Sequence, residues 1–394
     1  MLLKYKPLAQ VAKYCNSRIY SDNINYINYI STENMLPDKG GVARATSVPS
    51  QAVFSRYDAG DILLSNIRPY FKKIWYATAT GGCSNDVLIV RADGVDSKFL
   101  YYALSDNNFF NYSSITSKGT KMPRGSKTAI MKYLIPDYDR RTQHRIASIL
   151  SAYDDAIENN NRRVALLERA AREIYREWFV RLRFPGHENT KIVNGLPEGW
   201  GIEPVKYLAE IKSGYAFKSE WWRESGIPVI KIKDIQNNTL DLNNFDYVEP
   251  EHASKANKFY VDAGDLLIAM TGATIGKIAL VPSNGKILVN QRVGKFFLGE
   301  NPLEKVGFLY CFFQQDHIQE QIIQLSGSNS AQPNISPYDL CNIKMTYNQY
   351  MIEKYNKKVS SLFSQVINLR SQSQNLARQR DMLLPRLMSG KMGV

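Results

Sequence analysis

The sequence predicts an α+β protein in which two similar globular regions are separated by an antiparallel coiled coil of two long helices. Three observations lead to this prediction: a motif that occurs twice, two heptad patterns at a nearly constant offset, and a length of 394 residues. That length exceeds one ordinary domain, and 44% hydrophobic residues supply enough apolar side chains for more than one core.

The internal repeat is visible in two pairs of strings. DAGDILL at 58–64 recurs as DAGDLLI at 262–268, and FLYYAL at 99–104 corresponds to FLYCFF at 308–313. The offset is 204 residues for the first pair and 209 for the second. A small loop insertion in the second copy accounts for the difference, so we expect one structural plan used twice.

Each copy is followed by a segment in which seam residues recur at intervals of four and three, the heptad pattern of a coiled coil. The first seam consists of Ile146, Leu150, Tyr153, Ile157, Asn160, Val164, Leu167, Ala171, Ile174 and Trp178. Shifting this spacing by 209 residues gives a second seam, with apolar positions at Val359, Leu362, Val366, Leu369, Leu376 and Leu383. Residues between the seam positions are largely charged or amides, as expected of solvent-facing sides.

The two seams are not equally regular. Asn160 is a polar seam residue that either fixes the register of the pair or is a tolerated defect. Ser373 and Arg380 interrupt the second seam. Pro385 is expected to end or bend the second helix near Leu384, because proline lacks the amide hydrogen that a helix needs.

Proline and glycine punctuate the chain. They predict a first globular region at 1–139, a central helix at 140–185, a second globular region at 186–346 and a C-terminal helix at 347–394. The linker after the central helix is short, so the second region should lie near the far end of that helix. The C-terminal helix then returns antiparallel to the first, which relates the two regions by a pseudo-two-fold axis.

The globular regions are predicted to mix strands and helices. Short apolar runs bounded by turn residues predict strands at 61–65, 87–91, 229–232 and 266–270. Longer runs predict helices at 98–110 and 304–324.

The charge balance points to a polyanionic partner. Lysine and arginine number 50 against 37 aspartates and glutamates, a formal net charge of +13. Nucleic acid is favoured before an anionic membrane, and charge that only serves solubility is the alternative. No apolar run is long enough to span a membrane, and no signal-peptide stretch begins the chain. We therefore expect a cytoplasmic protein with free cysteines, no membrane contact and double-stranded DNA as its partner.

Two different globular regions on a pseudo-two-fold axis match the dyad of B-DNA and predict an asymmetric, bipartite target, with the helices as a ruler. Loops rich in cations and amides are the candidate contacts, although each residue alone also fits a solvated loop. In the first copy they are Arg68, Tyr70, Lys72, Lys73, Lys118, Lys121 and Arg124. In the second copy they are Lys231, Lys233, Thr271, Lys277, Asn290, Gln291, Arg292, Asn329 and Gln332.

The sequence offers no catalytic constellation. The segment 271–277 resembles a phosphate loop, but three residues separate its glycines where four are required, so a tight turn between strands is expected. The four histidines are far apart, and His144 and His317 are expected on the surface. The acidic cluster Asp154, Asp155 and Glu158 is expected on the outer face of the helix, in a solvated or partner-facing role rather than in acid–base catalysis. We therefore predict no catalytic residue, metal or cofactor in this chain.

Several strings in fixed order carry a resemblance to a known family. They are GDILLSNIRPYFKKI, GTKMPRGSK and the helix QHRIASILSAYDDAIENNNRRVALLERAAREIYREWF in the first half, and LPEGWGIEPVKYLAEIKSGYAF, IPVIKIKDI, GDLLIAMTGATIGK, SGSNSAQPNIS and LLPRLMSGKM in the second. The sequence resembles the specificity subunits of type I restriction–modification enzymes over essentially its whole length.

The resemblance implies two target recognition domains, each reading one half of a split DNA sequence. It implies helical spacers that dock two methyltransferase subunits, and restriction/translocase subunits recruited to that core. The methyl donor, S-adenosylmethionine, would bind the methyltransferase and not this chain. A stand-alone DNA-binding regulator with two readers on a coiled-coil ruler is the alternative, and a purely structural scaffold is a third reading.

Overall fold

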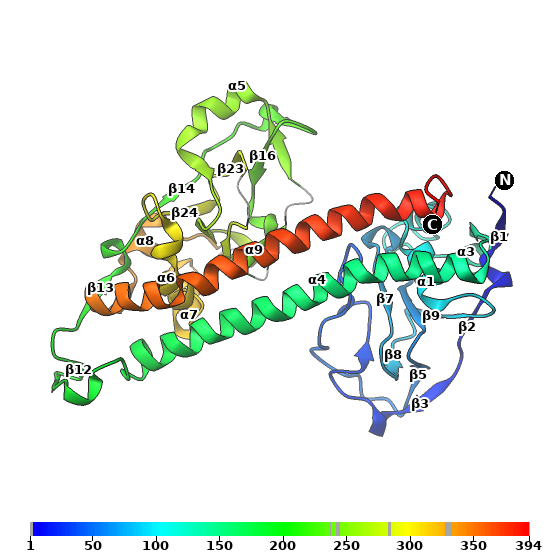
Figure 1. Ribbon diagram of the computed structural model, residues 1–394, viewed down its shortest axis with the longest axis horizontal. Helices are drawn as coiled ribbons and strands as arrows, with labels where there is room; N and C mark the ends of the chain where they lie inside the picture. Colours follow the sequence, from blue (N-terminus) through cyan, green and yellow to red (C-terminus); the bar gives the residue numbers. More distant parts are fainter. Residues whose placement is uncertain (1–2, 237, 242–244, 283–284, 328–332, 394) are drawn as a thin grey trace. The chain divides into compact units, whose positions relative to one another are not determined.

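The computed structural model describes residues 3–393 except 237, 242–244, 283–284 and 328–332. The chain forms two compact units. Unit 1 comprises Met1–Ala156 and Leu376–Val394, and unit 2 comprises Ile157–Asn375. The long helices α4 (Arg140–Tyr175) and α9 (Gln349–Met388) each supply residues to both units (Figure 1).

Unit 1 is built on an antiparallel sheet with the strand order β2-β9-β6-β7. Its strands are β2 (Ala12–Tyr14), β6 (Ile62–Ser65), β7 (Ile74–Tyr76) and β9 (Val87–Ala92). A second sheet has the order β3-β5-β8-β4, from β3 (Arg18–Tyr20), β4 (Tyr29–Ile30), β5 (Val53–Tyr57) and β8 (Gly81–Cys83). The remaining elements are the pair β1 (Tyr5–Pro7) and β10 (Leu134–Pro136), and the helices α1 (Ser97–Ser105), α2 (Asn107–Ile115) and α3 (Lys127–Ile130).

Unit 2 repeats this plan. Its first sheet has the order β14-β24-β21-β22, from β14 (Glu210–Ser213), β21 (Leu266–Ala269), β22 (Ile278–Leu280) and β24 (Val293–Phe297). Its second sheet has the order β15-β19-β16-β23-β20, from β15 (Trp222–Arg223), β16 (Ile227–Ile230), β19 (Asp246–Val248), β20 (Tyr260–Val261) and β23 (Ile287–Val289). The pair β13 (Gly201–Pro204) and β25 (Lys344–Tyr347) corresponds to β1 and β10.

Shorter elements complete unit 2. They are the hairpins β11 (Ile192–Val193) with β12 (Leu196–Pro197) and β17 (Ile235–Gln236) with β18 (Thr239–Leu240), and the helices α5 (Pro250–Ala253), α6 (Val306–Phe312), α7 (Asp316–Leu325) and α8 (Pro337–Asn342). The predicted α+β class and the internal repeat are thus confirmed.

The repeated apolar string is explained by a central strand that is covered on both faces. In β6, Ile62 and Leu64 belong to the core beneath the helices, whereas Leu63 faces the second sheet. In β21 the same alternation places Leu266 and Ile268 under the helices, with Leu267 against the second sheet. A strand buried on both sides needs apolar residues at successive positions, which is why the string reads as a continuous run.

The paired helices run antiparallel in each unit, as predicted. In unit 1 the Tyr138 hydroxyl, just before α4, donates to the Leu387 carbonyl at 2.8 Å, and farther along α4 Asp154 pairs with Arg380. In unit 2, Val164 packs against Val366 and Leu369. Farther along α4, the Ala171 carbonyl accepts from the Tyr355 hydroxyl at 2.9 Å. All sixteen predicted seam residues, from Ile146 to Leu383, are buried or half-buried.

Two predictions about single long helices were wrong. The helix predicted at 98–110 is broken at Asp106, whose carboxylate caps α2 by accepting from the Asn108 amide at 2.8 Å. The helix predicted at 304–324 is likewise divided, because Gln315 has extended backbone angles between α6 and α7.

Pro385 does not end the second helix, which continues to Met388. The residues around it, Leu384, Leu387 and Met388, are buried in the core of unit 1. Burying three large apolar side chains contributes several kcal/mol, which offsets the roughly 3 kcal/mol that an internal proline costs.

The predicted position on the outer face of the helix is correct for Asp155 and Glu158, which are exposed, but wrong for Asp154. Its carboxylate accepts from the Tyr102 hydroxyl at 2.6 Å and from the Arg380 guanidinium at 2.5 Å. Arg380 therefore does not simply interrupt the seam, because it pairs with an acid on the facing helix. His144 and His317 are exposed, as predicted, and the four cysteines are free.

Candidate nucleic-acid interface

In unit 1, three loop segments meet where β6 ends. The Asn66 amide donates to the Asp86 carbonyl at 2.8 Å, and the Gly125 amide donates to the Asn66 carbonyl at 3.0 Å. The Arg68 amide donates to the Pro123 carbonyl at 2.8 Å. We call this surface edge 1; it consists of residues 66–73, 84–86 and 118–126.

Unit 2 contains the same arrangement where β21 ends. The Met270 amide donates to the Arg292 carbonyl at 3.0 Å, and the Ile335 amide donates to the Met270 carbonyl at 3.0 Å. The Gly272 amide donates to the Pro333 carbonyl at 3.1 Å. We call this surface edge 2; its described residues are 270–277, 290–292 and 333–336.

The structure brings all seven candidates of the first copy to edge 1. Arg68, Tyr70, Lys118, Lys121 and Arg124 are exposed, and Lys72 and Lys73 are half-buried. Two of these cations already have partners within the unit. Arg124 pairs with Asp86 at 3.1 Å, and the Lys73 ammonium donates to the Thr32 carbonyl at 2.6 Å, where burial lowers its pKa.

Edge 2 gathers five candidates of the second copy. Lys277, Gln291 and Arg292 are exposed, whereas Thr271 and Asn290 are buried. The Asn290 side-chain oxygen accepts from the Arg292 amide at 3.3 Å, so it shapes the turn that presents its two neighbours. Asn329 and Gln332 lie outside the described residues.

Lys231 and Lys233 lie beside edge 2, since the Thr274 hydroxyl donates to the Ile232 carbonyl at 3.4 Å. Both ammonium groups are paired with Asp246, at 3.1 and 2.8 Å. Burial alone would raise the pKa of Asp246, but hydrogen bonds from the two lysines hold it below its ordinary value. These two lysines are therefore less available to an external anion than the sequence suggests.

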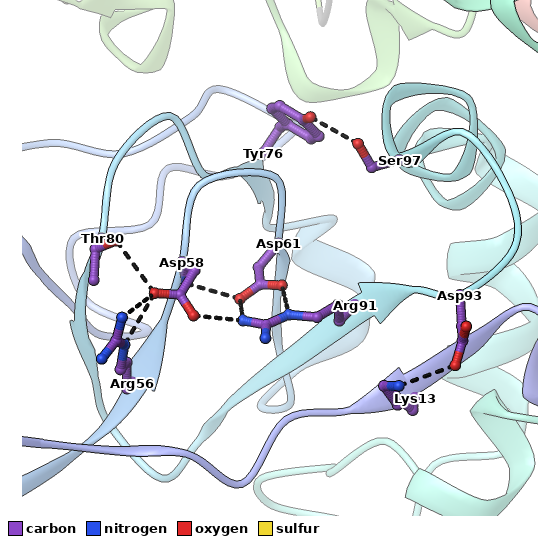
Figure 2. A network of polar contacts seen from close by, with 9 residues as sticks. All are labelled: Lys13, Arg56, Asp58, Asp61, Tyr76, Thr80, Arg91, Asp93 and Ser97. Carbon is purple, nitrogen blue, oxygen red and sulfur yellow. Dashed lines mark hydrogen bonds and ion pairs between the residues drawn. The ribbon is translucent and has the colours of Figure 1, made fainter.

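The DAGD string forms a structural ion-pair network at the other end of β6 (Figure 2). Arg91 binds both carboxylate oxygens of Asp61 at 2.6 Å and also reaches Asp58 at 2.8 Å. In unit 2, Asp265 is paired with Lys295 at 2.7 Å. Each second aspartate also accepts a backbone amide three residues before it. These carboxylates are neutralised by adjacent cations, so they hold the turn together and do not form an acid–base pair.

Sequence reasoning missed Asp86, which occupies the place that Arg292 has in edge 2. The turn before β9 carries an acid and the turn before β24 carries a cation, so equivalent positions of the two edges have opposite charge. It also missed Asn66, whose buried side-chain oxygen has no hydrogen-bond partner within the described residues, as is true of the Thr271 hydroxyl. Aligning the two copies at the ends of β6 and β21 would have revealed the opposite charges of Asp86 and Arg292.

Comparison with known proteins identifies the family to which this chain belongs. A family model described as the type I restriction modification DNA specificity domain matches the chain twice, over residues 10–169 and 197–375. The chain belongs to the family of type I restriction–modification specificity subunits. Such a subunit recognises DNA sequence and is not the catalytic component, so the two edges are candidate DNA contacts rather than an active site.

Named relatives agree with this assignment. The specificity subunit of the type I enzyme MjaIX from Methanocaldococcus jannaschii is 25% identical over 316 residues, which cover 78% of this chain and 71% of the relative. The HindI specificity subunit from Haemophilus influenzae is 21% identical over 440 residues, covering 92% of this chain and 94% of the relative. The crystal structure of an S subunit from M. genitalium shares the fold, with a TM-score of 0.57, 17% identity, and 98% and 96% of the two chains covered.

In the described part of this specificity subunit, no helix is long and apolar enough to cross a membrane. The same described residues contain no cluster of three histidine, cysteine or acidic side chains arranged to hold a metal ion.

Proposed function

We propose that edge 1 and edge 2 each read one half of a bipartite, asymmetric DNA target. The observation that carries this proposal is the repetition of one backbone arrangement with different side chains. Each edge joins the same three segments through the same three backbone hydrogen bonds. One scaffold that presents two sets of side chains is suited to reading two different sequences.

The chemistry of the exposed groups supports DNA as the ligand. Edge 1 presents Arg68, Lys118 and Lys121, which can bind phosphates or the acceptor atoms of guanine. Edge 2 presents Gln291 and Arg292, which pair by geometry with adenine and guanine. Because the exposed groups differ, the two half-sites should differ in sequence.

The chain supplies recognition, and partner subunits supply chemistry. We propose that it works with two methyltransferase subunits, which bind S-adenosylmethionine, and with restriction/translocase subunits. The relatives are named as specificity subunits of type I restriction enzymes, and the match to the HindI relative covers 92% of this chain and 94% of that relative. The isolated chain should therefore bind DNA without methylating or cutting it.

Methylation-aware sequencing tests this proposal. The chain is expressed with a type I methyltransferase subunit from the same organism in a host that lacks both, and methylated positions are mapped. We expect methylation at a split motif that appears only when both proteins are present. Methyl transfer by the purified chain alone, or a methylation pattern that ignores the chain, would contradict the proposal.

A further inference from the structure

Arg68 and Lys72 hold left-handed backbone conformations in edge 1, with φ angles of 49° and 52°. They stand on either side of the 3-10 turn Pro69–Phe71. In the left-handed region the Cβ atom of an L-residue crowds the following carbonyl oxygen, so residues other than glycine, asparagine and aspartate seldom adopt it. Two long cationic residues at such positions call for an explanation.

Edge 2 has the corresponding turn, but glycine occupies both left-handed positions, so the backbone there is not strained. Gly272 and Gly276 have φ angles of 72° and 80°, and Gly272 begins the corresponding 3-10 turn Gly272–Thr274. They lie 204 residues after Arg68 and Lys72, the offset of the repeated string. The backbone plan thus calls for a left-handed residue at both places, and glycine satisfies it without strain. In the first copy, Arg68 and Lys72 occupy these two left-handed positions.

A neighbouring turn fixes this geometry in unit 1. Asp38 and Lys39 are also left-handed, with φ angles of 51° and 63°. Their amides donate to the carbonyls of Phe71 and Lys72, both at 2.9 Å. Local strain persists where surrounding structure over-determines it, and such strain gathers at functional sites.

The two side chains have no polar partner in the part of the chain that the structure describes. Arg68 is exposed and Lys72 is half-buried. Within the described part of the chain, neither side chain makes an ion pair or a side-chain hydrogen bond, although the nearby cations Arg124 and Lys73 have partners. A strained backbone that carries two unneutralised cations is unfavourable for stability and suitable for binding an anion.

We propose that Arg68 and Lys72 anchor edge 1 to DNA phosphates, and that edge 2, with glycine at both positions, lacks this anchor. The assignment rests on the proposed function. It makes the two domains chemically unequal: the first holds the backbone through the turn after β6, and the second depends at that turn on close approach of the main chain. Phosphate contacts of this kind fix the position of a reader on the duplex.

Glycine substitution separates binding from folding. We compare Arg68→Gly and Lys72→Gly in the full chain, using duplex DNA with the target found by methylation mapping. Each variant should keep or raise the melting temperature, by up to about 2–4 °C. Glycine relieves the backbone strain of the folded chain, and this effect offsets the extra conformational freedom that glycine gives the unfolded chain. Each should lower DNA affinity and reduce the slope of log K against log salt by about 0.9 for the lost phosphate contact.

Two controls make the result specific. Asn194 is also left-handed, with a φ of 52°, and lies exposed in the turn between β11 and β12, so Asn194→Gly should leave DNA affinity unchanged. Arg68→Lys keeps the charge and should retain the wild-type salt slope, which distinguishes lost charge from a loosened loop.

The outcomes are distinct. If the wild type binds its target and both glycine variants bind with equal affinity and salt slope, the anchor assignment is wrong while the proposed function stands. A fall in melting temperature with unchanged binding would mean that the two residues serve the fold. A wild-type chain that shows no salt-dependent DNA binding would overturn the proposed function together with the anchor.

Discussion

The Arg370 guanidinium donates to the Glu168 carboxylate at 2.6 Å, and both side chains are buried between α9 and α4 in unit 2. Tyr310 donates to the same carboxylate oxygen at 2.5 Å, and Arg370 also donates to the Asn238 carbonyl at 2.8 Å. One arginine therefore joins both helices and the β17–β18 hairpin. Unit 1 has a related group in Tyr102, Asp154 and Arg380, with the acid again on α4 and the arginine on α9.

Replacing Arg370 with alanine should destabilise unit 2 by about 3–5 kcal/mol, because Glu168 would be left as an unpaired buried charge. Urea unfolding followed by tryptophan fluorescence measures this, since every tryptophan except Trp75 lies in unit 2. A Trp75→Phe background makes the signal specific. Lys358→Ala, on an exposed position of α9, is the control and should change stability little. A loss under about 1 kcal/mol for Arg370→Ala would show that the pair is not needed.

The pair between Asp61 and Arg91 gives a second prediction, in unit 1. Asp61 is almost fully buried, and an asparagine there would turn an amide donor toward a guanidinium, so Asp61→Asn should cost about 2–3 kcal/mol. Figure 2 also contains the control: Lys13 and Asp93 form a 3.0 Å pair in which both side chains are exposed. Urea unfolding followed by far-ultraviolet circular dichroism measures both variants, and Asp93→Asn should cost less than about 0.5 kcal/mol. Equal losses for the two variants would refute the structural role of the repeated DAGD turn.

The buried carboxyl group of Asp234 should make the free energy of unfolding depend on pH. Burial raises the pKa of its carboxyl to about 6, partly opposed by a hydrogen bond from the Lys231 amide. Between about pH 4 and pH 6 the folded chain retains a proton that the unfolded chain releases, so ionisation of Asp234 lowers stability as pH rises through this window. Asp234→Asn should remove that decrease. Unfolding midpoints of wild type and variant between pH 4.5 and 7 measure the difference, and parallel curves would contradict the assignment.

Features that impose a regular pattern along the chain could be predicted from the sequence, whereas contacts between distant residues could not. The repeat, the central strands and the seams were predictable, because burial on both faces of β6 and along one stripe of α4 imposes a regular apolar pattern. The partners of single charges were not. Asp154 meets Arg380, and Lys231 meets Asp246, through contacts that no spacing in the sequence encodes.

The same limit applies to the residues of edge 1 and edge 2. Loops rich in cations and amides could be named from composition, and the structure gathers most of them at two equivalent strand ends. Which cations are free could not be named, because the partner of Lys73 is a backbone carbonyl 41 residues away. The left-handed angles at Arg68 and Lys72 were also hidden, since only alignment with Gly272 and Gly276 exposes them.

The final prediction concerns spacing between the half-sites. α4 and α9 each supply residues to both units, with the divisions after Ala156 and after Asn375. Seven residues inserted at both divisions add about 10 Å to each helix and preserve the heptad register. If the helices set the distance between the readers, the target should gain about three base pairs of spacer while both half-sites stay unchanged. Methylation mapping of the lengthened chain measures the new target directly.

Two controls test the reason for such a shift. The same seven residues inserted in α4 alone would move Glu168 away from Asp154 without moving Arg370 away from Arg380. The two ion pairs could then not form together along the helices, so that variant should lose stability rather than change its target. Seven residues inserted in the exposed turn at Asn194 lengthen the chain without lengthening a helix, and should leave the spacing unaltered. An unchanged spacer in the doubly lengthened chain would mean that the helices do not act as the ruler.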